Sequence, residues 1–153
     1  MTGCDTGEQS RDRLPLTSAV GLEIYDAFAP APAAPDVGSL YFTVVNVGSE
    51  PDTLVAMETS AGGMATLHEM IHEAGAMRMQ ATGPMAISAS DTLRLRPGGY
   101  HVMLSDLSFR PAVGDTVDVI LTFTRSGTIE FSAPVLTYTE VVRLLGEPGG
   151  TEH

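Results

Sequence analysis

The sequence predicts an all-β domain, built as a two-sheet sandwich or a Greek-key barrel. Short segments rich in Val, Ile, Leu, Thr, Phe and Tyr alternate with clusters of Gly, Pro, Asp and Ser, which is the pattern of strands separated by turns. No segment keeps its apolar residues at the 3.6-residue period of a helix over a dozen positions. Seven to nine short strands at this spacing are typical of both architectures.

Turn-forming residues separate the expected strands. Residues 96–99, Arg-Pro-Gly-Gly, fix one φ at proline and supply two positions that tolerate positive φ. Residues 113–115 and 125–127 carry similar glycine-containing signals. The strands are expected at residues 20–25, 40–47, 53–57, 66–71, 76–81, 92–95, 100–104, 116–123 and 129–135.

The chain is expected to form one domain over residues 16–145. Its 153 residues, 43% of them hydrophobic, supply enough apolar side chain for a single core. Residues 1–15 are polar and unpatterned and are expected to be a flexible tether, and residues 146–153 a flexible tail. The tail ends in His153, to which we assign no role.

The charge of the chain argues against nucleic acid as a partner. Nineteen acidic residues face eight arginines, and the formal net charge of −11 repels phosphate backbones and anionic lipids. The same charge favours a cationic ligand or a basic protein surface, and it is also typical of adaptation to salt. The sequence contains no run of about eighteen apolar residues, so it predicts no membrane-spanning helix.

Motifs of catalysis are not found in the sequence, and we expect a protein that is not an enzyme. No Ser/His/Asp arrangement and no glycine-rich phosphate loop is present. Asp26, Asp106 and Asp115 could be paired on paper as an acid/base site. They lie beside turn residues, so they are read as turn and cap formers.

Cys4 is the single cysteine, which excludes an intrachain disulfide and a thiolate cluster from this chain alone. It follows Met1-Thr2-Gly3, which resembles the last positions of a bacterial lipoprotein processing signal. Two interpretations stay open: Cys4 is a lipid attachment point, or it is an exposed thiol in the tether.

Methionine and histidine gather in one part of the chain. Six of the eight methionines and three of the four histidines lie between residues 64 and 103. A single methionine usually fills space in a core. Residues 100–104, however, are expected to form a strand, and side chains along a strand alternate between its two faces. His101 and Met103 then share the face that points away from the core, where a shallow metal site can form.

Residues 67–80 are expected to form a hairpin with a similar pattern. His68-Glu69-Met70 and Met77-Arg78-Met79 flank a turn signal. If the residue numbers of each directly opposed pair add up to 147, His68 lies across from Met79 and Met70 lies across from Met77. All four side chains then share one face. A slip of one residue would put His68 and Met79 on opposite faces.

Thioether and imidazole groups together favour Cu(I). A thioether is a soft ligand and imidazole is borderline, whereas Mg²⁺ and Ca²⁺ require oxygen ligands. Thioethers bind without losing a proton and cannot form disulfides, so such a site keeps working in an oxidising compartment. This chemistry suits the periplasm or another extracytoplasmic location.

The intervals between the candidate ligands resemble the signature of the PCu(A)C copper chaperones. Ten residues separate His68 from Met79, twenty-one separate Met79 from His101, and one separates His101 from Met103. Similarity extends over about residues 19–131, and its stretches are residues 26–29, 41–46, 67–70, 95–104 and 114–117. Phe28 stands where many members of that family have tryptophan.

The resemblance implies a cupredoxin-like β-barrel with Cu(I) bound by His68, Met79, His101 and Met103. It also implies delivery of copper to the copper centre of a respiratory oxidase or to another assembly factor. Met70 and His72 are further ligand-capable groups, and their part in transfer or in a Cu(II) form stays open, as does the oligomeric state.

Three other functions are alternatives to a copper chaperone. The same ligands would serve copper scavenging or tolerance at the cell surface. A metal-free β-sandwich interaction module would use the methionines as core and need no metal. An electron-transfer cupredoxin normally needs a cysteine beside two histidines, and Cys4 lies in the tether.

Overall fold

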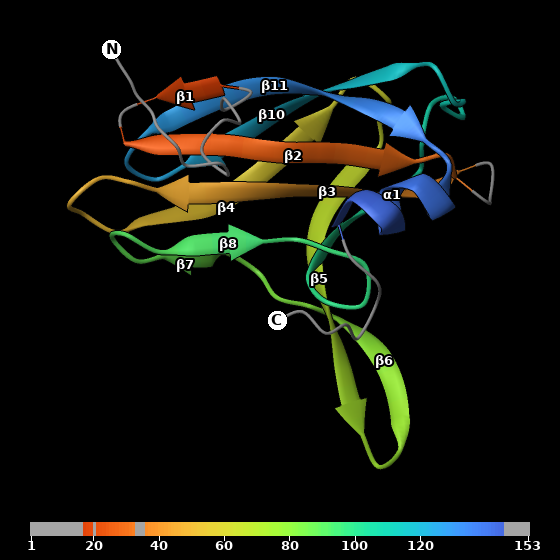
Figure 1. The fold of residues 1–153 in the computed structure, drawn as a ribbon, viewed down its shortest axis with the longest axis horizontal. Helices are drawn as coiled ribbons and strands as arrows, with labels where there is room; N and C mark the ends of the chain where they lie inside the picture. The colour runs from red at the N-terminus through yellow and green to blue at the C-terminus, as the bar shows by residue number, and fades with distance from the viewer. Residues whose placement is uncertain (1–16, 20, 33–35, 146–153) are drawn as a thin grey trace.

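The structure is a computed structural model, which describes residues 17–19, 21–32 and 36–145. The described part of the chain contains eleven strands and one short helix (Figure 1). The expected all-β fold class is therefore confirmed. The elements are β1 (Thr17–Ala19), β2 (Leu22–Pro30), β3 (Val37–Asn46), β4 (Asp52–Thr59), β5 (Met64–Glu73), β6 (Ala76–Ala81), β7 (Met85–Ile87), β8 (Thr92–Arg94), β9 (His101–Ser105), β10 (Thr116–Phe123), β11 (Gly127–Leu136) and α1 (Tyr138–Leu145).

The nine expected strands are all present, and the structure adds the short strands β1 and β7 and the helix α1. Helix α1 was not expected because it is only eight residues long. It begins after Thr137, whose hydroxyl accepts a hydrogen bond from the Glu140 N–H, and it buries Val141 and Leu145. The tether, the tail, Cys4 and His153 lie outside the described residues. Within the described residues, no helix has the length and apolar character needed to cross a membrane.

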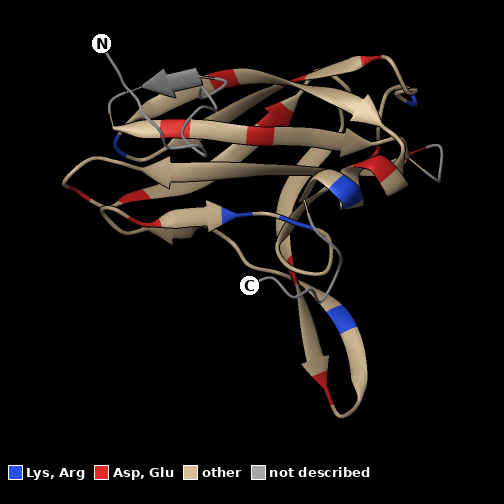
Figure 2. Ribbon diagram, in the orientation of Figure 1, with Lys and Arg blue, Asp and Glu red and all other residues tan. Residues whose placement is uncertain are grey.

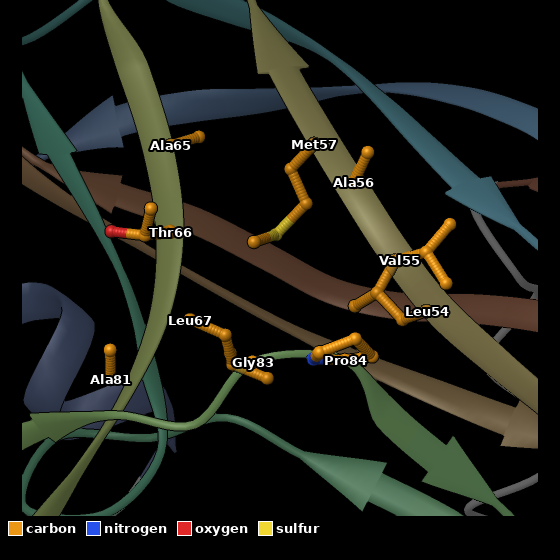
Figure 3. A pocket seen from close by; sticks show the side chains of 10 residues that line it. All are labelled: Leu54, Val55, Ala56, Met57, Ala65, Thr66, Leu67, Ala81, Gly83 and Pro84. Atoms are coloured by element: carbon orange, nitrogen blue, oxygen red, sulfur yellow. The ribbon is translucent and has the colours of Figure 1, made fainter.

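The strands form one curled sheet. Neighbouring strands follow the order β6-β5-β9-β3-β2-β11-β10-β4-β7, with β1 added to β2 and β8 to β3. At the seam of this barrel β4 and β5 lie side by side without a ladder between them in the described residues. An apolar hollow lies there, and Met57 of β4 points across it toward Thr66 and Leu67 of β5 (Figure 3).

The core follows from alternation along the strands. In β10 and β11 every second residue is buried and the residues between face solvent, as expected for strands with one covered face. Phe42 is fully buried and meets Phe131 edge to face, with ring centroids 5.5 Å apart. Phe28 is partly buried against the same core, so the phenylalanine acts there as a packing residue.

Asp26, Asp106 and Asp115, which were expected to form turns or caps, occupy turns or irregular backbone. Asp26 (φ 52°) lies at the irregularity in the β2–β3 ladder, and Asp106 (φ 55°) follows the end of β9. The Asp115 carboxylate accepts a hydrogen bond from the Ala112 N–H within a loop. These conformations suit aspartate, which tolerates the left-handed region better than most residues.

Asp52 ties the start of β4 to the turn between β10 and β11. Asp52 is only 4% exposed. Its carboxylate accepts hydrogen bonds from the backbone N–H groups of Thr53, Arg125 and Ser126 and from the hydroxyls of Thr124 and Ser126. Burial raises the pKa of the Asp52 carboxyl, but these hydrogen bonds outweigh burial and hold the pKa below its ordinary value.

We expect Asp52→Asn to lower the free energy of unfolding at pH 7 by about 1–3 kcal/mol, because an amide accepts fewer of these hydrogen bonds and leaves buried N–H groups unsatisfied. Since the folded pKa lies below the unfolded one, the contribution of Asp52 is present above about pH 4 and is lost as the pH falls through the folded pKa. Urea unfolding across this range should show the difference from wild type shrinking in acid. Asp91→Asn, at an exposed aspartate, is the control, and an equal effect of both variants would contradict the account.

Candidate metal site

The β5–β6 hairpin is closed by the two-residue turn Ala74-Gly75. Both residues have positive φ, 53° and 80°, as the type I′ turn requires. The hairpin extends away from the body of the barrel (Figure 1). Its ladder pairs His68 with Ala81, Met70 with Met79 and His72 with Met77.

The predicted register of this hairpin is wrong by two residues, since facing positions sum to 149 and not to 147. The predicted register would centre the turn on Glu73 and Ala74, whereas Gly75 accommodates positive φ without steric cost and draws the turn toward itself. A shift of two residues preserves the alternation. His68, Met70, Met77 and Met79 therefore share one face, as predicted, although His68 faces Ala81.

Strand β9 brings the second histidine beside the first. His68 of β5 pairs directly with His101 of β9, and Thr66 pairs with Met103. The two imidazole rings stack with centroids 6.0 Å apart and an angle of 22° between their planes. Two residues that are 33 positions apart in the sequence thus lie next to each other on one face of the sheet.

Met79 reaches this histidine pair from β6. Its sulfur lies 3.2 Å from the His101 Nε2 atom. Met79 is diagonal to His68 across the β5–β6 ladder, a position from which a long side chain can reach. Nitrogen and sulfur ligands of one tetrahedral metal ion are about 3.6 Å apart, so the observed spacing suits two ligands of a shared ion.

Hydrogen bonds at Nδ1 orient both imidazoles. The His101 Nδ1 atom lies 3.3 Å from the Gly99 carbonyl oxygen, and the His68 Nδ1 atom lies 3.4 Å from both the carbonyl and the hydroxyl oxygen of Thr66. An Nδ1–H that donates to oxygen leaves the Nε2 lone pair available for a metal. The sequence reasoning missed Thr66 and Gly99, each of which precedes its histidine by two residues and could be found by that spacing.

His101 is the most enclosed of the candidate ligands. It lies on the face opposite the buried Val102 and Leu104, as predicted, but it is only 7% exposed rather than open to solvent. Burial lowers the pKa of His101; the hydrogen bond with the Gly99 carbonyl raises it, and the nearby His68 lowers it further, so the net shift is downward. His101 therefore keeps a neutral, metal-binding imidazole at lower pH than an ordinary histidine.

Met103 lies one cross-strand pair further along the same face. It is partly buried in β9, between Thr66 of β5 and Ser39 of β3. His101 and Met103 are two residues apart, so their Cα atoms are separated by roughly 6.7 Å. The structure therefore joins His68, Met79 and His101 by contact and places Met103 beside them.

The site is open on the side of the hairpin. Met79 is 46% exposed, and His68 and Met103 are partly buried. Among the described residues no group of three or more His, Cys, Asp or Glu side chains could hold a metal ion. The thioethers of Met79 and Met103 are the further soft groups beside the two imidazoles.

Comparison with known proteins places the chain in a family. Residues 22–135 match the family described as "Putative lipoprotein LpqE-like". "Putative lipoprotein Lxx21020" of Leifsonia xyli subsp. xyli is 31% identical over 140 residues, which are 91% of this chain and 84% of the relative.

Solved structures share the fold. The solution structure of CuI-DR1885 from Deinococcus radiodurans is 29% identical, with a TM-score of 0.64 over 78% of this chain and 81% of that one. The copper-bound PCuAC domain from PmoF2 is 23% identical, with a TM-score of 0.66 over 79% of this chain and 97% of that one. The resemblance to PCu(A)C domains is thereby confirmed, and the chain belongs to the LpqE-like family.

Proposed function

We propose that this chain is a copper metallochaperone domain that binds one Cu(I) ion through His68, Met79, His101 and Met103 and passes the ion to another protein. The observation that carries the proposal is the 3.2 Å approach of the Met79 sulfur to the His101 Nε2 atom, with the His68 ring stacked alongside. Two imidazoles and two thioethers form a set that suits Cu(I) and disfavours oxygen-seeking ions.

Openness of the site favours transfer over permanent storage. An acceptor protein can approach the exposed Met79 first and replace the donor ligands one at a time, while the enclosed His101 holds the ion until the last exchange. Copper remains Cu(I) throughout, so the step needs no electron and no catalytic residue. The role is non-enzymatic.

Relatives support copper as the cargo. DR1885, which is 29% identical to this chain, has been solved in its CuI form. The PCuAC domain from PmoF2, which has a similar fold, has been solved with copper bound. An electron-transfer role is disfavoured because the described residues include no cysteine. The alternatives that keep the same site are scavenging and tolerance of copper, which require binding but no acceptor.

The location and acceptor belong to the same proposal. The family and the Leifsonia relative are named as lipoproteins, which supports attachment through Cys4 and an extracytoplasmic site of action. The acceptor is proposed to be the copper centre of a respiratory oxidase or a factor that assembles it. Methionine and histidine ligands suit the oxidising conditions outside the cytoplasm.

Competition with a Cu(I)-specific chelator under anaerobic conditions tests the binding. We expect wild-type protein to bind one equivalent of Cu(I) with submicromolar affinity. No binding at that strength would exclude a chaperone and favour the metal-free interaction module.

Transfer is tested by mixing Cu(I)-loaded protein with the soluble copper-binding domain of an oxidase subunit. We expect copper to appear in the acceptor, which metal analysis of the separated proteins would measure. Tight binding with no transfer to an oxidase domain or to another assembly factor would favour scavenging.

A further inference from the structure

The outer part of the β5–β6 hairpin carries ligand-capable side chains that the proposed site does not use. Met70 lies across from Met79, and His72 lies across from Met77 at the next pair toward the turn. Since alternation is unbroken along both strands, these side chains share the face of His68 and Met79. Beyond Ile71 every residue of the hairpin is exposed.

Exposure makes core packing a poor explanation for this face. Met77 is 50% exposed and Met79 is 46% exposed, and neither belongs to the buried core of the barrel or to the residues packed against it. A methionine used as filler is surrounded by apolar neighbours. Met77 instead stands in solvent beside an imidazole.

The opposite face of the hairpin carries four polar side chains and one ion pair between the two strands. Arg78 forms an ion pair with Glu73, with 2.8 Å between Nε and Oε1, and donates a hydrogen bond to Gln80 at 3.1 Å. In Figure 2 the hairpin has one basic position on β6 and an acidic one near the end of β5. The Arg78–Glu73 ion pair joins the two strands beside the turn, and the backbone ladder keeps His72 opposite Met77.

We infer that His72 and Met77 form a second, weaker Cu(I) site, with the Met70 thioether as a third ligand. The inference rests on the proposed function and extends it to a separate position on the hairpin. Directly opposed residues have Cβ atoms about 4.5–5.5 Å apart, a span that an imidazole and a thioether can close around one ion. Cu(I) accepts such a low number of soft ligands, whereas Mg²⁺ and Ca²⁺ take six or more oxygens.

The two sites lie in line along one face. The pair His72 and Met77 is one step of about 6.7 Å from the pair Met70 and Met79, and Met79 contacts His101 of the inner site. Met70 therefore lies between a ligand of the outer site and a ligand of the inner one. Copper can move from the exposed turn to the enclosed histidine, or back to an acceptor, by replacing one ligand at a time.

Anaerobic Cu(I) titration against chelators of graded affinity tests the outer site. Wild-type protein should bind a second equivalent more weakly than the first, and His72→Ala/Met77→Leu should lose the second and keep the first. Glu69→Ala/Gln80→Ala changes a directly opposed pair on the polar face and should keep both. Binding of one equivalent by wild type, or an unchanged second equivalent in His72→Ala/Met77→Leu, would overturn the inference.

A His101→Ala variant separates this inference from the proposed function. It should lose tight binding yet retain the weak equivalent, and the methyl resonance of Met77 in ¹³C-methyl-methionine spectra should still shift when Cu(I) is added. Failure of the Met77 signal to shift at saturating Cu(I) would overturn the outer site alone. Tight binding unchanged in His101→Ala would contradict the inner site and leave the outer one standing.

Discussion

Replacing His101 by alanine is expected to lower the Cu(I) affinity of the inner site roughly 100-fold or more. Structural four-ligand sites bind Zn²⁺ with about 10–16 kcal/mol, so one ligand of such a set contributes on the order of 3 kcal/mol, which corresponds to about a 100-fold change. His101 should lie at the upper end because it contacts Met79 and stacks on His68. Burial also lowers the pKa of its imidazole, which favours the neutral form that binds metal.

The matched control for this variant is His72→Ala, which removes an imidazole from the same face at the exposed end of the hairpin. It should leave the tight equivalent within a few-fold of wild type. Chelator competition measures both affinities, and circular dichroism checks that each variant keeps its β-sheet spectrum. A folded His101→Ala protein that binds Cu(I) as tightly as wild type would contradict the assigned ligand set.

Replacing Gly63 by alanine is expected to destabilise the fold by more than about 3 kcal/mol. Gly63 has φ +69°, and an added Cβ would overlap the backbone carbonyl oxygens of Ser105 and Asp106. A left-handed backbone alone costs about 1–2 kcal/mol for a residue with a Cβ, and two backbone oxygens cannot move aside without disturbing β9. The next residue, Met64, pairs with Ser105, so the clash falls where the β5–β9 ladder begins.

Gly75→Ala is the control for this prediction. Gly75 also has positive φ, at 80°, but no atom lies within 4 Å of its added Cβ. It should therefore cost only about 1–2 kcal/mol, from backbone conformation alone. Urea unfolding of both variants measures the difference, and equal destabilisation would show that the contact with β9 is not what restricts position 63.

Alternation along strands made most of the fold predictable from the sequence. Val119, Leu121 and Ile129 are buried where a two-residue period places them, and glycine and proline clusters mark the turns. Helix α1 could not be read from periodicity because eight residues span only about two turns. Thr137 and Glu140 form the pattern of a capping box, which would have indicated its start.

The site was predictable as a face but not as a set of contacts. The alternation of side chains along each strand placed His68, Met79, His101 and Met103 on one face of the sheet. An error of two residues in the hairpin register leaves this alternation unchanged. Which residues oppose one another depends on where the turn closes, and Gly75 decides that through its positive φ. The burial of His101 depends on neighbours such as Met79, which a strand pattern does not include.

X-ray absorption at the copper edge, on protein carrying one equivalent of Cu(I), tests most directly whether two imidazoles and two thioethers share one ion. We predict a first shell of nitrogen and sulfur in equal numbers, with the sulfur contribution lost in Met79→Leu/Met103→Leu. A first shell without sulfur in the wild type, or a sulfur contribution unchanged in that variant, would contradict the account.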